Sequence, residues 1–207
     1  MPIHHMLYRC PRCGHDPLSG HKGRAECLAC GTKFERGRGA IIVVRPPGGP
    51  PEETSANHLL LALKNLGGPS LVTDKHGESL FREAKIALGR VEGHDVIRSR
   101  GEVVGFSEKT SWKGTGLLKL DGGTLCFKPD EGTEICFRSL DDIRGVQISS
   151  RAVQITLEGS RMHQFEFLED SPRRWEQLLC LSLERFHADR GETIVEFKPR
   201  LVTTRDG

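Results

Sequence analysis

The sequence predicts an α+β protein in which a small cysteine-rich module precedes an antiparallel β-barrel or sandwich with a C-terminal capping helix. Three observations support this prediction. Two Cys-x-x-Cys-Gly turns occur between Tyr8 and Glu35. From Gly101 onward, short β-rich segments alternate with turn residues. An amphipathic helical pattern follows them, led by Trp175.

The first predicted domain, residues 1–44, contains the spacing Cys10-x2-Cys13-x13-Cys27-x2-Cys30. Two tight turns that each offer two thiolates are the pattern by which many proteins hold a tetrahedral zinc ion. The sequence therefore predicts one Zn²⁺ site, with these four cysteines as its ligands. A redox role would need only one Cys-x-x-Cys pair.

Glycine follows the second cysteine of each turn, at Gly14 and Gly31. Glycine can take a positive φ there, which lets backbone N–H groups point at the sulfur atoms. His15 and His21 lie nearby and are interpreted as loop residues rather than as replacement ligands. The pattern resembles a zinc ribbon, which implies a closed shell of thiolates and a structural rather than catalytic metal.

Residues 45–54 are predicted to be a stiff linker, because Arg45–Glu53 contains four prolines and two glycines. Residues 55–98 are predicted to form a helical hairpin. Its first helix is predicted to begin with a cap at Thr54 or Ser55 and to stop at Gly67-Gly68-Pro69. The apolar residues of its second helix share one helical face: Leu80, Ala84, Ala87, Leu88 and Val91.

Residues 99–207 are predicted to contain the barrel or packed sheets and the last helix. Between Ala152 and Gly159, apolar residues alternate with polar ones, which indicates a strand with one buried and one solvent-exposed face. Ser171 and Pro172 suit the cap and the first position of the helix that follows.

Three further cysteines and an acidic pair lie in this region. Cys126, Cys136 and Cys180 are predicted to be small core residues. The pair Asp141-Asp142 is interpreted as a turn before a strand rather than as a cation site.

Over Gly101–Arg190, the order of strands followed by one helix with an apolar tryptophan resembles the pleckstrin-homology (PH) and GRAM domains. That resemblance implies a small barrel plugged by its C-terminal helix, and a basic loop after the first strand that binds phosphoinositides. The segment Ser107–Leu120 supplies the lipid-binding candidates, three lysines for phosphate groups and a tryptophan for the membrane interface. They are Lys109, Lys113, Lys119 and Trp112. Asp121 stands where the family has a further basic residue.

The whole arrangement, which opens with the stretch YRCPRCG (Tyr8–Gly14), is similar to the C-terminal extension of some bacterial phospholipid acyltransferases. Those enzymes carry a catalytic His-x4-Asp pair on a separate domain. No histidine of this sequence has an aspartate five positions later. The resemblance therefore implies an accessory module without the catalytic domain.

We expect a cytoplasmic, non-enzymatic, zinc-binding adaptor whose PH-like domain binds a protein partner or an anionic membrane lipid, with peripheral membrane association. An odd number of cysteines, seven, is typical of a reducing compartment. No signal-peptide pattern and no apolar run of transmembrane length is present.

Two alternatives are retained. One is a lipid-metabolism enzyme whose site the sequence does not reveal. The other is nucleic-acid binding through residues 1–40, which contain seven basic and three acidic residues. The formal net charge of the whole chain, +2, disfavours the second alternative.

Overall fold

The computed structural model describes residues 2–66, 72–74, 77–79, 81–121, 124–137, 140–149, 151–196 and 202–205. The chain divides into two compact units. The first unit comprises Met1–Ser70 with Ser171–Leu178, and the second comprises Leu71–Asp170 with Leu179–Gly207. Both units consist mostly of antiparallel sheets with a few helices, which agrees with the general α+β class predicted from the sequence.

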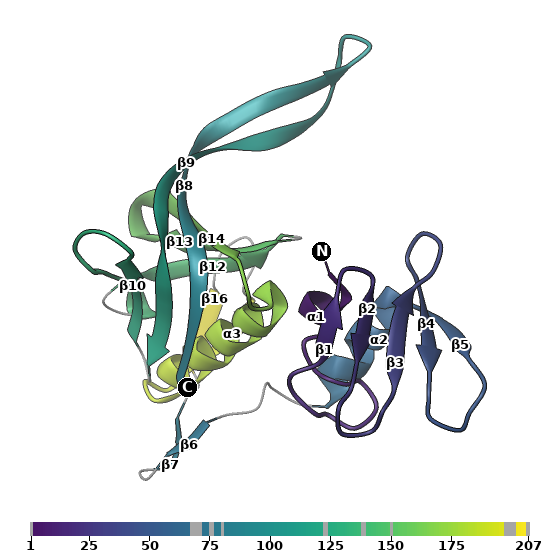
Figure 1. Ribbon diagram of the computed structural model, residues 1–207. Coiled ribbons are helices and arrows are strands. Elements are labelled where there is room, and N and C mark those ends of the chain that lie inside the picture. Colours follow the sequence, from purple (N-terminus) through teal and green to yellow (C-terminus); the bar gives the residue numbers. More distant parts are fainter. Residues whose placement is uncertain are drawn as a thin grey trace. The chain divides into compact units, whose positions relative to one another are not determined.

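The first unit is built on a five-stranded sheet in the order β1-β2-β3-β4-β5 (Figure 1). Its strands are β1 (Ser19–His21), β2 (Arg24–Glu26), β3 (Lys33–Arg36), β4 (Ile41–Arg45) and β5 (Glu52–Ser55). Its helices are α1 (Ile3–Met6) and α2 (Ala56–Asn65). Both helices share one buried core with β2, β3 and β4, and Phe34 is fully buried in it.

The prediction of a linker at residues 45–54 is wrong. Arg45 ends β4 and Glu52 begins β5, and the two strands pair antiparallel. The proline-rich segment is therefore the loop of a hairpin inside the first sheet. Prolines are tolerated there because loop residues donate no hydrogen bonds to the sheet.

The first predicted helix is confirmed as α2. Ser55 caps it by accepting a hydrogen bond of 3.1 Å on its Oγ from the backbone N of His58. The helix buries Leu59 and Leu63 in the core of the first unit, so it belongs with the cysteine-rich module.

The second predicted helix, and with it the helical hairpin at residues 55–98, is wrong. Phe81–Ser99 forms strand β8. Ala84, Ile86 and Leu88 are buried at every second position, which is the period of a strand. Helical and extended spacing both fit such a short apolar pattern, and β9, later in the chain, supplies the hydrogen bonds that decide between them. Leu80 lies outside the described residues.

The second unit is built on a seven-stranded antiparallel sheet in the order β11-β10-β9-β8-β14-β13-β12. Besides β8, its strands are β9 (Glu102–Asp121), β10 (Thr124–Pro129), β11 (Ile135–Phe137), β12 (Ile143–Ile148), β13 (Ala152–Leu157) and β14 (Arg161–Phe167). Within the described residues β11 and β12 are edges and do not pair, so the sheet is open and no closed barrel forms.

Shorter elements complete the second unit. Two-stranded ribbons pair β6 (Val72–Asp74) with β7 (Gly77–Ser79), and β15 (Glu192–Glu196) with β16 (Val202–Arg205). The 3₁₀ turns are η1 (Leu140–Asp142) and η2 (Glu158–Ser160). The predicted turn at Asp141-Asp142 is confirmed as η1, directly before β12.

The predicted C-terminal helix is confirmed as α3 (Pro172–Ala188). Ser171 caps it, since its Oγ accepts a hydrogen bond of 3.3 Å from the backbone N of Arg174. Trp175, Leu179 and Leu183 of this helix are fully buried. Among the described residues, no helix is both long and apolar enough to cross a membrane.

The predicted buried face of β13 is confirmed, since Val153, Ile155 and Leu157 are buried. The prediction of a solvent-exposed opposite face is wrong at Gln154, which is only 4% exposed. Its side chain accepts a 2.6 Å hydrogen bond from Gln147 and donates a 2.9 Å hydrogen bond to Gln164, which lie opposite it on the two neighbouring strands. Neighbouring side chains thus satisfy the buried amide.

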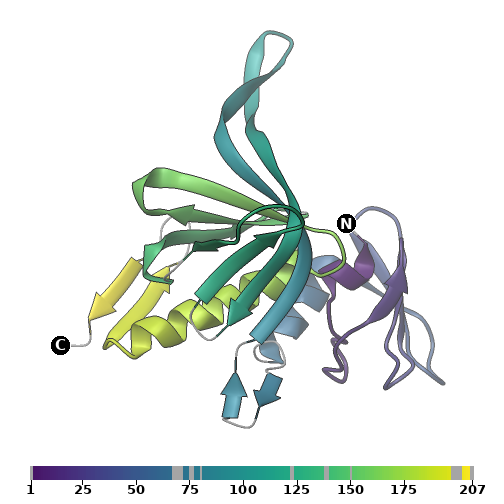
Figure 2. The same cartoon turned by 60° about the vertical axis from the view of Figure 1, so that its left-hand side comes forward.

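The β8–β9 hairpin is longer than the sheet that contains it. Strand β14 pairs with β8 only as far as Val91, and β10 pairs with β9 only from Gly116 onward. Beyond Val91, β8 pairs only with residues 102–109 of β9, so residues 92–109 form a two-stranded arm that projects from the sheet, as Figures 1 and 2 show. Arg100 and Gly101 have φ of 51° and 87°, which suits a two-residue turn that matches the strand twist.

His163 is expected to make the second unit less stable in acid. It pairs with Arg90 of β8, and burial, aided by Arg90 and Arg161, lowers its pKa. An unfolded histidine titrates near pH ~6.5. Between that pH and the lower pKa of the folded state, the imidazole is protonated in the unfolded chain but not in the folded chain. The free energy of unfolding therefore falls as the pH decreases through this range.

Replacing His163 with glutamine is therefore expected to flatten the loss of stability between about pH 7 and pH 5, measured by chemical denaturation. His94, exposed on the arm, gives the matched control H94Q, which should keep the wild-type slope. Equal slopes for wild type and H163Q would contradict this assignment.

Candidate metal centre

The two Cys-x-x-Cys-Gly turns, Cys10–Gly14 and Cys27–Gly31, are called the first and the second hook. A backbone hydrogen bond closes each of them. The N–H of Gly14 donates to the carbonyl of Cys10 at 2.9 Å, and the N–H of Gly31 donates to that of Cys27 at 2.8 Å. The two glycines have φ of 76° and 68°. The predicted reason for glycine at both positions, a positive φ, is confirmed.

The hooks bring the four predicted ligands together. The first hook lies between α1 and β1, and the second connects β2 to β3. All four sulfur atoms lie within 4.8 Å of one another. The Sγ atoms of Cys10 and Cys30 are 3.6 Å apart, and those of Cys13 and Cys27 are 3.5 Å apart. Four thiolates at ~2.3 Å from a tetrahedral zinc are spaced by about 3.8 Å. The cluster could therefore hold a metal ion such as zinc.

The cluster is part of the first unit's core. Cys10 and Cys27 are fully buried among its apolar residues, whereas Cys13 is exposed. Burial raises the pKa of the Cys10 thiol. Burial also opposes ionisation of Cys30, but hydrogen bonds from Thr32, Cys27 and Cys10 together outweigh it and lower the pKa of Cys30 to about 6. A cation would have to offset the burial of Cys10.

The structure also reveals supporting residues that the sequence analysis missed. Within the first unit, Arg174 forms an ion pair with Asp16 and donates a hydrogen bond of 3.2 Å to the backbone carbonyl of Tyr8. Tyr8 in turn donates its hydroxyl proton to Gln177. These contacts hold the chain on both sides of the first hook. They join residues more than 150 positions apart, so no local signal could predict them.

The two nearby histidines are not in the cysteine cluster. His15 contributes through its backbone: its carbonyl accepts a hydrogen bond of 2.8 Å from the N–H of Cys10, and its own N–H donates to the Cys13 sulfur. His21 is an exposed residue of β1 rather than of a loop.

The predicted lipid-binding residues do not lie in a loop. Lys109, Trp112, Lys113 and Lys119 are all part of the continuous strand β9. Ten residues of extended chain span about 33 Å, so Lys109 and Lys119 are too far apart to share one phosphate group. Two of the lysines already form ion pairs: the Nζ of Lys113 is 3.8 Å from a carboxylate oxygen of Glu92, and the Nζ of Lys119 is 3.2 Å from one of Asp121. Trp112 is 49% exposed and covers Gly89.

The prediction that Cys126 and Cys136 are ordinary core residues is wrong. They lie opposite each other on β10 and β11 and are joined by a disulfide. Cys126 is half-buried and Cys136 is exposed. Cys180, on α3, is half-buried.

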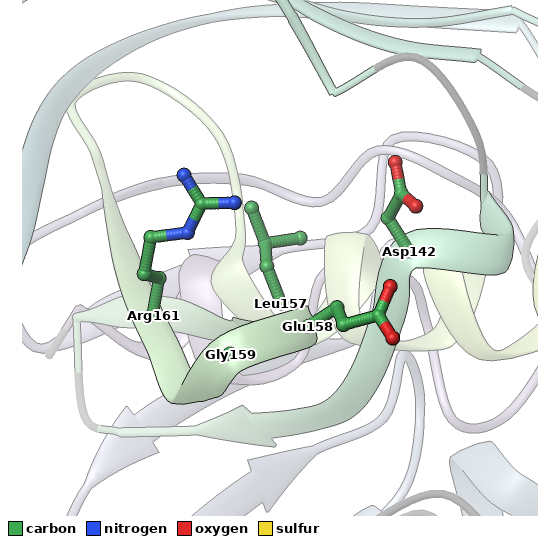
Figure 3. A pocket seen from close by; sticks show the side chains of 5 residues that line it. All are labelled: Asp142, Leu157, Glu158, Gly159 and Arg161. Carbon is green, nitrogen blue, oxygen red and sulfur yellow. The ribbon is translucent and has the colours of Figure 1, made fainter.

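A pocket of about 370 Å³ lies where β13 passes through η2 into β14. Figure 3 shows the carboxylates of Asp142 and Glu158 on one side of Leu157 and the guanidinium of Arg161 on the other. A further arginine, Arg144, pairs with Glu158 at 3.8 Å. Within the described part of the chain, the pocket's acidic residues do not belong to a metal-ligating group.

No family of known proteins matches the chain, and no curated protein matches it. Among solved structures, it is similar to the crystal structure of the C-terminal domain of an unknown protein from Leishmania infantum. The identity is 14% and the TM-score is 0.30, over 61% of this chain and 96% of that chain. A TM-score this low supports neither a shared fold nor a shared function.

Proposed function

We propose that this protein is a zinc-binding, non-enzymatic adaptor. A structural zinc ion on Cys10, Cys13, Cys27 and Cys30 stabilises the first unit, and the β8–β9 arm of the second unit binds a protein partner. The observation that carries this proposal is the arm itself: residues 92–109 project from the sheet with apolar side chains in solvent.

The donor set supports a structural metal. Four thiolates complete a tetrahedral shell and leave no position for water or substrate. Two of the four sulfurs belong to buried residues of the unit's core. A metal bound there would add directly to folding free energy.

The arm supports the binding of a protein. Four aliphatic side chains near its tip are about half exposed: Val96, Ile97, Val103 and Val104. Consecutive strand residues point to opposite faces, so these side chains leave apolar surface on both faces of the ribbon. An isolated two-stranded ribbon is marginally stable in water, and a partner that covers such surface would stabilise it. Both edges of the arm lack a neighbouring strand among the described residues. A partner could therefore add a strand to an edge and cover the apolar side chains.

The arm's charge does not favour an anionic membrane. Glu92, Asp95, Glu102 and Glu108 accompany its basic residues. Arg98, near the tip, donates a hydrogen bond of 3.2 Å to the carbonyl of Gly101. We further propose that the open sheet and α3 are a variant of the PH-like or GRAM-like fold, accessory to phospholipid metabolism, with protein binding in place of lipid binding.

The basic residues of the first unit are partly neutralised, which disfavours nucleic-acid binding. On the sheet surface Glu35 lies between Arg24 and Arg45, at 3.6 Å and 3.0 Å. Lys33 lies 3.9 Å from Glu26 on the same sheet. A nucleic-acid interface needs a continuous basic surface rather than alternating charges.

The proposal is tested with a photo-crosslinking amino acid placed at Val104, in cells of the native organism. We expect a discrete protein adduct, and we expect V103D to weaken the purified, identified partner's binding at least about tenfold. The matched control is the same amino acid at Leu61, which is 58% exposed on α2 and should give no such adduct. Adducts with lipid alone, or equal binding by V103D, would contradict protein recognition by the arm.

A further inference from the structure

The edge of the second sheet carries a cysteine pair that the proposed function does not use. Cys126 on β10 and Cys136 on β11 occupy directly opposed positions, with Leu125 facing Phe137 and Phe127 facing Ile135 on either side. Opposed residues of antiparallel strands have Cβ atoms ~5 Å apart, so the backbone register brings the two side chains together. Strand β11 is an edge of the sheet, and Cys136 is exposed on it.

We propose that Cys126 and Cys136 form a thiol–disulfide exchange site, whose co-reactant is a small disulfide of the oxidised glutathione class. The site is independent of the metal centre and of the arm. The pairing register places the resolving thiol opposite the attacking one, and the exposure of Cys136 makes it the sulfur that a solvent-borne disulfide can reach.

The exchange proceeds in two balanced steps. The Cys136 thiolate attacks one sulfur of the small disulfide, the S–S bond of that molecule breaks, and one small thiolate leaves. Cys136 then carries a mixed disulfide. The Cys126 thiolate attacks the Cys136 sulfur, the mixed disulfide breaks, and the second small thiolate leaves. The protein loses two protons and two electrons, and one small disulfide becomes two small thiols.

Glu134 lies beside the cysteine pair, with its Oε1 3.1 Å from the Cys136 sulfur. In the reduced protein, a Cys136 thiol at this distance would donate a hydrogen bond to that carboxylate, which a disulfide sulfur cannot do because it carries no hydrogen. Oxidation exchanges that hydrogen bond for a covalent bond between β10 and β11. The short edge strand is thereby fixed to the sheet, and the outer edge of β10 stays covered.

The test uses the reduced, zinc-loaded full chain, treated with oxidised glutathione and analysed by peptide mass spectrometry. In the wild type we expect the Cys126–Cys136 bond and no retained glutathione on either residue. In Cys126→Ser we expect glutathione to remain on Cys136, because no second thiol can displace it. In Cys136→Ser we expect the half-buried Cys126 to be modified at least about tenfold more slowly. Cys180→Ser is the matched control and should behave as wild type.

Three outcomes would overturn the proposal. The first is that wild type keeps both thiols in excess oxidised glutathione. The second is that C126S retains no glutathione on Cys136 while its far-UV circular dichroism is that of wild type. The third is a second zinc ion per reduced chain, lost in C126S, because Cys126, Glu134 and Cys136 lie close enough together to hold a metal.

Discussion

Replacing Cys27 with serine is expected to release the metal and unfold the first unit. Cys27 is a ligand candidate in the second hook, and its side chain is fully buried in the core that also contains Phe34. Structural zinc contributes apparent free energies of about 10–16 kcal/mol in zinc-finger peptides. A unit with so small an apolar core cannot replace a contribution of that order. We expect most of this free energy to be lost.

Metal analysis and hydrogen exchange check the prediction together. Wild type should contain about one zinc per chain, C27S much less, and backbone amides of β2, β3 and β4 should lose protection in C27S. Cys180→Ser, a cysteine outside the cluster, is the control and should keep both zinc and protection. A wild-type protein from zinc-replete cells that lacks zinc, or a C27S chain with wild-type protection, would refute a structural zinc.

Replacing Gly116 with alanine is expected to disrupt the pairing of β9 with β10. A Cβ at this position would lie 2.2 Å from the carbonyl oxygen of Lys128 and 2.6 Å from the Cα of Pro129. Both atoms are backbone, so the clash can be relieved only by moving β10 away from the ladder. Overpacking of this kind costs about 1–3 kcal/mol. We expect G116A to fall in the upper part of that range.

Chemical denaturation of the full chain measures the effect, followed by probes in the second unit. The matched control is Gly105→Ala, because Gly105 lies on the same strand and a Cβ there would meet no atom within 4 Å. The control should change stability by no more than about 0.5 kcal/mol. If G116A and G105A unfold at the same denaturant concentration, β10 does not approach β9 closely at Gly116.

The four cysteine ligands could be predicted from the sequence because the residues that form each hook are adjacent in the chain. Each hook needs two cysteines and one glycine within five positions, and the hook geometry follows from that spacing. Helix α3 was predictable for the same reason, since Ser171 and Pro172 mark its start within two residues.

The errors share a cause as well. In Phe81–Ser99 the apolar spacing fits a helix and a strand, and only pairing with β9 selects the strand. The proline-rich segment could be a spacer or a hairpin loop, and only the pairing of β4 with β5 decides. The cysteines at 126 and 136 look like separate core residues until β10 and β11 place them opposite each other.

Local sequence was enough to locate the cysteine ligands, the starts of α2 and α3, and the β-rich half of the chain. These features depend on turns, caps and periodicities within a few residues of each other. Three other features required the fold: Phe81–Ser99 is strand β8, the candidate lysines lie within strand β9 rather than in a loop, and residues 92–109 project as an arm. Hydrogen bonds between distant strands establish those features, because a strand has no hydrogen-bond partner within its own segment.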